Sequence, residues 1–502
     1  ALPIYLVQLL KNNPGKFNYG SSGIGTSQHL SGELFKLMTG TDMVAIPYKG
    51  SAPGIADVVA GQVHLSIDPG SSTLPFVKSG KLRPVAVLGK ERSPMVPGLK
   101  TLAEQGLPEG WDGAPVQDHR GRLLMPGFID THVHCPQLDV IASYGTELLD
   151  WLNTYTFPAE RRYADPEVSR QGAARFLRAL WAHGSTSAVV FPTVHQVSAE
   201  ALFEAAHAQH MRLITGKVLM DRFAPEGLLD EAADLGERAC TELIERWHGR
   251  GRLACAVTVR FAATSTPAQL AMAGRLCREH ASVYMQTHVA ENRAEIDWVM
   301  SLFPEARSYL DVYARAGLLG PRAVLAHGIW LDAEDRAVLR DHGAQIAHCP
   351  SSNLFLGSGL FDWAQAQREG LSVSLASDVG GGTSLCLLRN MADAYKIQAL
   401  QGTRLSAWKA LHAATLGAAE ALGLADEVGR IEPGCMADLT VWDWAVGELA
   451  QHRDALACTR LDGTVASLHE RVFAWMTLGD ERNLVGTWVA GRPVFQRGTA
   501  LA

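Results

Sequence analysis

The sequence predicts an α/β protein whose largest part is a closed (β/α)8 barrel of the TIM type. Eight apolar, β-rich runs recur along the chain, and amphipathic helical stretches separate them. Strands that are apolar along their whole length belong to a parallel sheet covered on both faces. Eight such units favour a closed barrel, and a doubly wound open sheet is the alternative. The predicted strands are residues 123–134, 186–191, 212–220, 254–261, 283–289, 323–328, 343–350 and 371–378.

Length and composition are those of a globular enzyme. At 502 residues, of which 47% are apolar and 19% charged, the chain is long enough for about three domains. No uninterrupted apolar run approaches the ~18 residues that a membrane helix needs. A net charge of −7 is too mild to indicate nucleic acid or an anionic membrane as a partner. We therefore expect a small-molecule partner, no nucleic acid and no membrane.

The composition changes abruptly near residue 115. Residues 1–110 contain eight lysines, two arginines and no tryptophan, whereas the remaining residues contain three lysines and all twelve tryptophans. Lys and Arg both belong mostly on solvated surfaces, so folding alone gives no reason for this change. We infer that two unrelated sequences are joined between Pro108 and Pro115. The expected domains are residues 1–114, 115–425 and 426–502.

The first domain alternates short apolar runs with turns, as a small α/β fold does. These runs lie within residues 17–40, 42–67 and 82–89. The loop GSSGIGTS (20–27) leads into a helix predicted over 29–38. Backbone N–H groups at this helix start would suit a carboxylate or phosphate, and a plain connector without a ligand is the alternative.

This first domain resembles the periplasmic solute receptors of tripartite tricarboxylate transport systems. The resemblance rests on YGSSGIGTSQHLSGELFKLMTGTDMVAIPYKGSAPGIADVVAGQVHLSID and KLRPVAVLGKERSP, and it covers roughly residues 8–112. Such receptors clamp a small carboxylate between two lobes. The resemblance implies that one lobe is largely absent here, so this receptor-like fragment should bind such a ligand weakly or not at all.

Metal-competent side chains stand at the carboxyl ends of the predicted strands, where barrels of this type carry their active sites. His132 and His134 end the first strand, His288 the fifth and Asp378 the eighth. Because side chains alternate along a strand, the first two histidines project from one face and can reach a single ion. Neutral imidazoles with a carboxylate suit zinc, one ion per chain, or another divalent metal such as Fe²⁺.

Other polar residues at these strand ends are candidates for the chemistry. Arg260 ends the fourth strand, His327 ends the sixth, and Glu291 follows His288 by three residues. Glu291 can therefore carry protons to a substrate near the metal. Zinc lowers the pKa of bound water toward ~7 and so supplies hydroxide. Each residue alone is more often structural, but their common position at strand ends favours an active site.

Four motifs in order, PGFIDTHVH, QTHVAEN, LAHG and ASDVGGG, resemble the deaminases of the amidohydrolase superfamily and, within it, the guanine deaminase family. The strings HVHCPQLDVIASYGTELLDWLNTYTFPAERR, VRFAATS, THVAENRAEI and AHCPSSNLFLGSG agree with that family. The resemblance runs from about Pro115 to the C-terminus. It implies a zinc-dependent hydrolase that converts guanine to xanthine and ammonia by attack of metal-bound hydroxide on carbon 2.

The resemblance also implies a role for each matching residue. Four residues would hold the zinc ion: His132, His134, His288 and Asp378. Four residues would contact the purine: Gln137, Arg260, Phe261 and His288. Three residues would be catalytic: Glu291, which protonates ring nitrogen 3; His327, which orients or polarises the water or substrate; and Asp378, which accepts the water's proton.

Arg260 favours guanine over adenine. The 6-oxo group and nitrogen 7 of guanine are both acceptors that an arginine can contact together, whereas adenine has a donor at position 6. Leaving a buried donor unpaired costs on the order of 1–3 kcal/mol, about tenfold to a hundredfold in discrimination. The alternatives are a deaminase of another purine, a pterin or a triazine, and a carboxylate-binding transport receptor with an inert barrel.

The C-terminal residues predict strands outside the barrel. GRIEPGCMADLTVWD and NLVGTWVAGRPVF are strand-like, and in the resembled family such strands pair with N-terminal ones in a small β-sandwich. Only VQDHRGRLLM precedes the first metal motif, so we expect an incomplete flanking β-sandwich. We expect unpaired sheet edges around Val441–Trp442 and Thr487–Val489, with a cost in stability or solubility.

The chain ends and the cysteines bear on the compartment. The sequence starts Ala-Leu-Pro-Ile without an initiator Met or a signal segment, which is typical of a fragment whose start is missing. Its eight cysteines include no CxxC pair, which is typical of reduced cytosolic thiols. We therefore expect a cytoplasmic protein, although the first domain resembles a periplasmic one. The resemblance to the deaminases leaves a homodimer open.

Overall fold

The computed structural model describes residues 2–89, 91–105, 117–144, 148–230 and 233–499. The chain divides into two compact units, residues 1–118 and 119–502. The predicted junction between Pro108 and Pro115 lies outside the described residues. The second unit contains both the barrel and the C-terminal strands, so the domain boundary at residue 425 stays a prediction.

The first unit is a small α/β fold. Its elements are α1 (Leu2–Lys11), β1 (Asn18–Ser21), α2 (Ser27–Thr39), β2 (Val44–Pro47), α3 (Ser51–Val59), β3 (Leu65–Ser66), α4 (Gly70–Lys78) and the 3-10 turn η1 (Ala103–Gln105). The three strands form a parallel sheet with β1 in the middle. The loop after β1 leads into α2 as predicted, and Thr26 caps this helix by accepting a hydrogen bond from the His29 N–H. Within the apolar run 82–89, Val87 forms an isolated bridge with Thr101.

The second unit contains the predicted barrel. Its eight strands, in sheet order, are β5 (Phe128–His134), β6 (Ser185–Phe191), β7 (Arg212–Thr215), β9 (Leu253–Val259), β10 (Tyr284–Val289), β11 (Ala323–His327), β12 (Gln345–His348) and β13 (Ser372–Leu375). All neighbouring strands pair in parallel. The ring closes where the Asp378 N–H donates to the His132 carbonyl oxygen at 2.9 Å. The closed barrel is therefore confirmed, and the open-sheet alternative is wrong.

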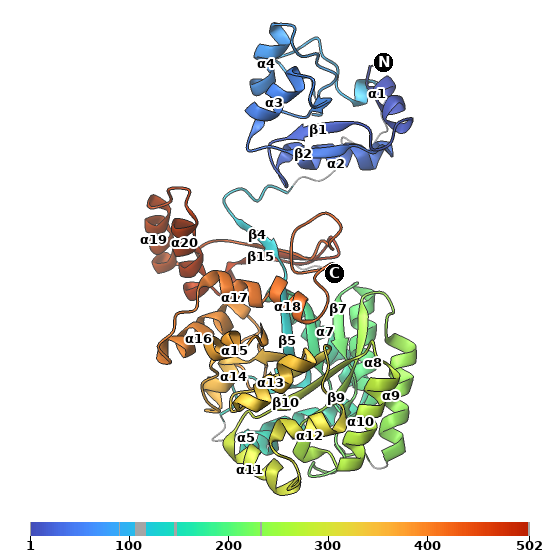
Figure 1. The fold of residues 1–502 in the computed structure, drawn as a ribbon, viewed down its shortest axis with the longest axis vertical. Helices are drawn as coiled ribbons and strands as arrows, with labels where there is room; N and C mark the ends of the chain where they lie inside the picture. Colours follow the sequence, from blue (N-terminus) through green and yellow to red (C-terminus); the bar gives the residue numbers. More distant parts are fainter. Residues whose placement is uncertain (1, 90, 106–116, 145–147, 231–232, 500–502) are drawn as a thin grey trace. The chain divides into compact units, whose positions relative to one another are not determined.

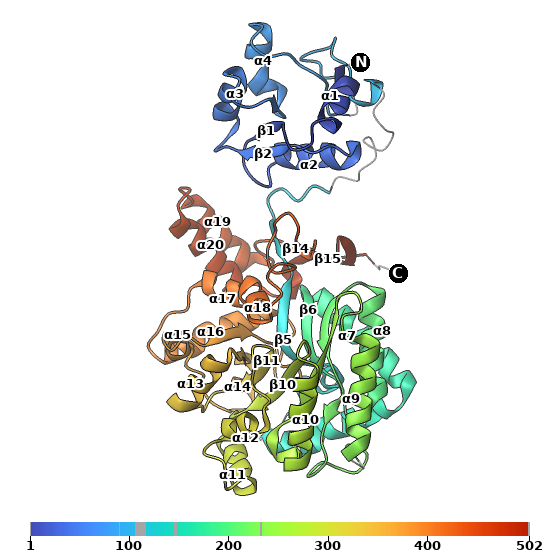
Figure 2. The same ribbon diagram turned by 45° about the vertical axis from the view of Figure 1, so that its right-hand side comes forward.

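Helices surround the barrel (Figures 1 and 2). They are α5 (Leu148–Trp151), the π-helical turn η3 (Leu152–Thr156), α6 (Phe157–Arg161), α7 (Pro166–Ala182), α8 (Gln196–Ala208), α9 (Ala233–Trp247), α10 (Pro267–Glu279), α11 (Arg293–Leu302), α12 (Tyr309–Ala316), α13 (Ala333–His342), α14 (Pro350–Phe355), α15 (Trp363–Arg368), α16 (Leu387–Leu400), α17 (Ala407–Ala413) and α18 (Leu416–Ala421). Helix α7 shows why they form: Asp165 caps it, Pro166 begins it, and Phe176, Leu177 and Leu180 are buried at helical spacing.

Small and β-branched side chains fill one end of the barrel. They come from alternating strand positions and pack with Ala418 and Ala419 of α18: Ile129, Val189, Ile214, Ala254, Ala256, Val324, Ala326 and Ala347. The Ile129 N–H near the start of β5 donates to the Ala414 carbonyl oxygen, so this cluster lies at the amino ends of the strands. The carboxyl ends are left for polar side chains.

The first predicted strand, 123–134, is in fact two strands. β4 (Leu123–Pro126) leaves the barrel, and β5 begins after Gly127. A side chain at Gly127 would place its Cβ 2.1 Å from Thr186 Oγ1, so the chain passes too close to β6 for any residue but glycine. The third predicted strand also divides, into β7 and β8 (Val218–Leu219).

The predicted unpaired edges around Val441–Trp442 and Thr487–Val489 are wrong. The elements beyond the barrel are β14 (Leu439–Trp442), α19 (Glu448–Thr459), α20 (Val465–Leu478), the 3-10 turn η6 (Glu481–Asn483), β15 (Leu484–Val489) and β16 (Arg492–Gln496). They form an antiparallel sheet of order β16-β15-β14-β4. The free edge of β14 pairs with β4, the short run before the first metal motif, and that of β15 pairs with β16. The expected incomplete sandwich is thus a four-stranded sheet, with β4 and β16 as its edges.

Among the described residues, no helix combines the length and the apolar character that crossing a membrane requires. All eight cysteines lie in the described part of the chain, and none is joined to another.

Candidate active site

Three histidines and an aspartate meet at the carboxyl ends of β5, β10 and β13. The Nε2 atoms of His132, His134 and His288 lie 3.2 Å from one another. Asp378 Oδ1 lies 3.2 Å from His132 Nε2 and 3.3 Å from His134 Nε2. These four donor atoms could hold one metal ion, and the histidines reach it from strands that are not neighbours in the barrel, β5 and β10.

The protonation of the cluster fits a cation. His288 Nδ1 lies 2.6 Å from the Arg260 carbonyl oxygen, which can only accept, so Nδ1 carries the proton and Nε2 presents a lone pair. His132 Nδ1 and His134 Nδ1 have no hydrogen-bond partner among the described residues. Lone pairs directed at one point repel each other unless a cation lies between them. The residues present therefore suit a divalent metal ion.

Burial and charge favour the same protonation states. Burial lowers the pKa of His134 to about 3 and that of His288 well below its ordinary value, so both imidazoles are neutral. Burial raises the pKa of Asp378, but contacts with His132 and His134 outweigh this effect and hold it well below its usual range. His134 and His288 are thus neutral imidazoles and Asp378 is an ionised carboxylate, the forms that bind a metal.

Glu291 lies buried beside this cluster. Its Oε1 accepts a hydrogen bond from Ser358 Oγ at 2.9 Å, and its Oε2 lies 3.4 Å from His327 Nε2. Burial, followed by the nearby charge of Asp378, raises the pKa of Glu291 to about 8, while the Ser358 hydrogen bond lowers it. A carboxyl group with this pKa can both hold and release a proton near neutral pH.

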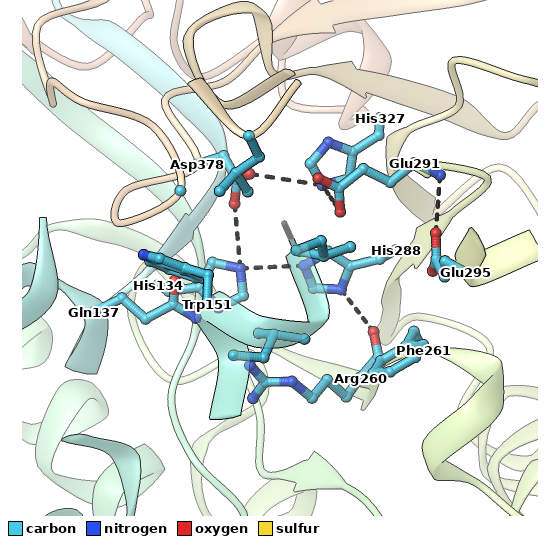
Figure 3. Close-up of a pocket in the computed structure, with 14 residues that line it drawn as sticks. His134, Gln137, Trp151, Arg260, Phe261, His288, Glu291, Glu295, His327 and Asp378 are labelled. Atoms are coloured by element: carbon cyan, nitrogen blue, oxygen red, sulfur yellow. Dashed lines mark hydrogen bonds and ion pairs between the residues drawn. The ribbon is translucent and has the colours of Figure 1, made fainter. Parts of the chain in front are cut away.

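His327 links Glu291 to Asp378. Its Nδ1 lies 2.8 Å from Asn353 Oδ1, and its Nε2 lies 3.6 Å from Asp378 Oδ2. The ring is buried, and Nε2 has no hydrogen-bond partner among the described residues. Asn353 therefore holds the ring so that Nε2 faces the space between the two carboxylates (Figure 3).

Three strand ends adopt strained backbone conformations at this site. Ala290 (φ 48°), His327 (φ 70°) and Asp378 (φ 50°) follow or end β10, β11 and β13 in the left-handed region. Each such residue costs of order 1–3 kcal/mol and persists only where its surroundings impose it. The strain coincides with the points where Glu291, His327 and Asp378 enter the site.

Gln137, Arg260 and Phe261 lie around the same pocket. All three are buried. In the view of Figure 3, Arg260 and Gln137 lie on one side of the histidines, and Glu291 and His327 lie on the other. The pocket contains about 440 Å³ of empty space and is lined by His134, Gln137, Leu148, Trp151, Leu152, Arg260, Phe261, His288, Glu291, Glu295, His327, Leu356, Asp378 and Gly381. Eight of the nine sequence-predicted residues line this pocket, and the ninth, His132, contacts three of them in the metal-competent cluster. Their individual roles stay predictions.

Several residues of the site were not predicted. Leu148, Trp151 and Leu152 line the pocket from α5 and η3, and Ser358 and Asn353 hold Glu291 and His327. They fall within the strings that carry the family resemblance, but no residue type or spacing distinguished them from ordinary core and loop residues.

Two family models match the chain, one after the other. The amidohydrolase family matches residues 123–494, and the tripartite tricarboxylate transporter family receptor matches residues 4–114. The two matches do not overlap, and the short interval between them lies close to the change in composition. They support the predicted fusion of two unrelated sequences.

The second unit is similar to guanine deaminases of bacteria and animals. The guanine deaminase of Escherichia coli K12 is 47% identical over 386 residues, which cover 77% of this chain and 86% of that protein. The human guanine deaminase is 31% identical over 384 residues, covering 74% of this chain and 83% of that protein.

Solved structures of guanine deaminases are also similar to this chain. The structure of E. coli guanine deaminase is 47% identical, has a TM-score of 0.73, and is matched over 76% of this chain and 87% of that one. Guanine deaminase from C. acetobutylicum, solved with bound guanine in its active site, is 27% identical with a TM-score of 0.68; the match covers 82% of this chain and 94% of that one.

Proposed function

The chain belongs to the amidohydrolase family, among its guanine deaminases, and we propose that its barrel converts guanine and water to xanthine and ammonia. The observation that carries this proposal is that one pocket joins a metal-competent cluster to a buried arginine and a buried amide. The cluster suits hydrolysis of a C–N bond, and the arginine and the amide suit recognition of a purine edge.

We assign zinc, one ion per chain, to His132, His134, His288 and Asp378. Neutral imidazole nitrogens and a carboxylate oxygen are the ligands that zinc prefers in catalytic sites. When bound, zinc supplies Lewis acidity that lowers the pKa of water and stabilises negative charge during hydrolysis.

Arg260, Gln137 and Phe261 hold the purine. The arginine is a donor-only group, so it matches the 6-oxo group and nitrogen 7 of guanine, which are both acceptors. Adenine would set its 6-amino donor against the same N–H groups. Phe261 adds an apolar wall to the pocket. We therefore assign guanine, rather than adenine, a pterin or a triazine, as the substrate.

The reaction forms a bond between water oxygen and carbon 2 of guanine and breaks the bond from carbon 2 to the exocyclic nitrogen. Asp378 accepts a proton from water, and Glu291 delivers a proton to ring nitrogen 3. His327 Nε2 orients the reacting atoms between the two carboxylates. Asp378 passes the proton that it accepted from water to the exocyclic nitrogen, which leaves as ammonia. The proton of the new hydroxyl group on carbon 2 returns to Glu291, so xanthine remains and both carboxyl groups are restored.

The test is ammonia release from guanine, adenine, a pterin and a triazine, with the metal content of the protein measured in parallel. We expect ammonia from guanine. Glu291→Gln should lower kcat by about 10²–10⁴-fold without changing the metal content, because it removes only the proton carrier. Glu279→Gln, on the exposed end of α10, is the matched control. A fully metal-loaded protein that releases no ammonia from guanine would overturn the proposal, and a rise in Tm with citrate alone would then favour the receptor alternative.

A further inference from the structure

A buried carboxylate on α6 holds both polar side chains that we assign to purine binding. Glu160 Oε2 accepts a hydrogen bond from Arg260 Nη1 at 2.6 Å, and Glu160 Oε1 accepts one from Gln137 Nε2 at 3.3 Å. All three side chains are buried. We infer that Glu160 is a positioning residue that orients Arg260 and Gln137 and thereby selects purines with an oxygen at position 6. This inference rests on the proposed function.

A second residue of α6, Phe157, also contacts Arg260. The guanidinium carbon of Arg260 lies 5.1 Å from the ring centroid of Phe157, at the start of α6. A cation over an aromatic face is attracted by the ring electrons, and a carboxylate hydrogen bond fixes its direction. The guanidinium is therefore restrained by a ring and a charge that come from a single turn of helix.

Gln137 is oriented by two contacts that agree. Its Nε2 faces Glu160, which is acceptor-only when ionised, and its Oε1 accepts a hydrogen bond from the Gly380 N–H at 3.2 Å. Exchanging the amide oxygen and nitrogen would break both contacts, so the assignment of the amide is determined by the network. Gln137 thus connects α6 to the loop that carries Asp378.

The pairing leaves donors for a ligand. Among the described residues, Nη1 is the only atom of the Arg260 side chain that donates a hydrogen bond. In the same part of the chain, Arg260 and Glu160 form an ion pair with each other and with no other residue. The charge of Arg260 is therefore compensated within the protein, while its other N–H groups remain for an acceptor on the substrate. A purine with hydrogen at position 6 keeps nitrogen 7 but lacks the oxygen, so it offers the guanidinium one acceptor instead of two. Glu160 should matter for guanine and much less for a purine without the oxygen.

The test compares two ligands in two variants. Glu160→Gln removes the charge at nearly constant shape, and Glu160→Asp keeps the charge at a shorter reach. Glu427→Gln is the matched control, because Glu427 pairs with Arg212 outside the pocket. The measurements are KM for guanine and the inhibition constant of 2-aminopurine, which lacks the 6-oxo group, at equal metal content.

We expect Glu160→Gln to raise KM for guanine at least about tenfold, since a charge-assisted contact is lost. The inhibition constant of 2-aminopurine should change by less than about twofold, and Glu427→Gln should change neither. If Glu160→Gln does not fold, Glu160→Asp must raise KM for guanine by a smaller factor and leave the inhibition constant of 2-aminopurine nearly unchanged. Equal effects on both ligands, or an unchanged KM, would overturn the inference, whereas a wild-type protein inactive on guanine would overturn the proposed function itself.

Discussion

His288 Nδ1 donates a hydrogen bond to the backbone carbonyl oxygen of Arg260, with 2.6 Å between the two atoms. The bond joins the end of β9 to β10, so the metal-competent cluster and the arginine that we assign to purine binding share one part of the barrel wall. It also fixes the tautomer of His288 that directs Nε2 at the other cluster atoms. In the proposed function, this contact links substrate recognition to metal binding through the main chain.

Loss of one cluster histidine should remove the metal. His132 is fully buried beneath the pocket, so His132→Asn changes the cluster without changing the pocket lining. We expect metal affinity to fall by more than about a hundredfold, because loss of a ligand should cost more than loss of a residue that only hydrogen-bonds a ligand. Ammonia release should fall together with the metal content. Elemental analysis after dialysis measures the first effect. His452→Asn, on exposed α19, should keep the wild-type metal content; a fully loaded His132→Asn protein would contradict the assignment.

Ser358 should set the pH at which Glu291 titrates. Its hydroxyl donates to Glu291 Oε1 at 2.9 Å and lowers the pKa of that carboxyl group, against the effect of burial. Ser358→Ala should therefore raise this pKa, and the limb of the kcat profile that depends on Glu291 should move to higher pH by about one unit. Ser301→Ala, which removes an exposed helix-end hydroxyl, is the control. A profile that stays in place or moves to lower pH would count against this role.

The buried pair Arg252–Asp438 should stabilise the joint between the barrel and the four-stranded sheet. Asp438 Oδ1 accepts from Arg252 Nη1 at 3.0 Å and from the Ala490 N–H at 2.8 Å, and Oδ2 accepts from Arg252 Nη2 at 2.5 Å. Asp438→Asn leaves a buried arginine uncompensated, which costs about 3–5 kcal/mol. Urea unfolding should show this loss, while Asp426→Asn, which changes a fully exposed carboxylate paired with the half-buried Arg430, should leave the midpoint unchanged. Equal midpoints for both variants would contradict the prediction.

Glu295 should make stability depend on pH. Its Oε2 accepts from the Glu291 N–H at 3.1 Å, and its Oε1 accepts from Tyr309 at 2.7 Å. Burial, then the neighbouring Glu291, raises its pKa from the ordinary 4.5 to about 7. A raised carboxyl pKa means that the folded state holds its proton longer than the unfolded state, so stability from this group is lost as pH rises from about 4.5 to about 7.

Glu295→Gln should remove this dependence. The free energy of unfolding of the variant, relative to wild type, should therefore increase between pH 5 and pH 8, by up to about 3 kcal/mol. Denaturant unfolding at both pH values measures the difference, and Glu279→Gln at the exposed end of α10 should show none. A difference that is the same at both pH values would refute the role of Glu295.

The barrel could be predicted because each strand is a local signal. β5, β6 and β9 are buried along their whole length, so apolar residues run through them without strict alternation, and His132 and His134 stand at the carboxyl end of β5. The histidines and Asp378 are recognisable for the same reason. Their convergence follows from the barrel itself, which brings all carboxyl strand ends to one side.

Long-range pairings carried no local signal. β4 and β14 are more than three hundred residues apart, and nothing in Leu123–Pro126 distinguishes a strand of the small sheet from the beginning of a barrel strand. The contact between Glu160 and Arg260 could not be predicted for a similar reason. Glu160 follows a π-helical turn in an irregular segment, and Arg260 lies a hundred residues away in the sequence. Such contacts become visible only in three dimensions.

The most direct test of the metal-dependent mechanism is a titration of chelator-treated protein with zinc, followed by ammonia release from guanine. The four-residue cluster would hold one ion, so activity should rise from near zero in proportion to added zinc and level off at one equivalent per chain. Undiminished activity in the metal-free protein, or activity that does not respond to zinc or another divalent metal, would contradict the account.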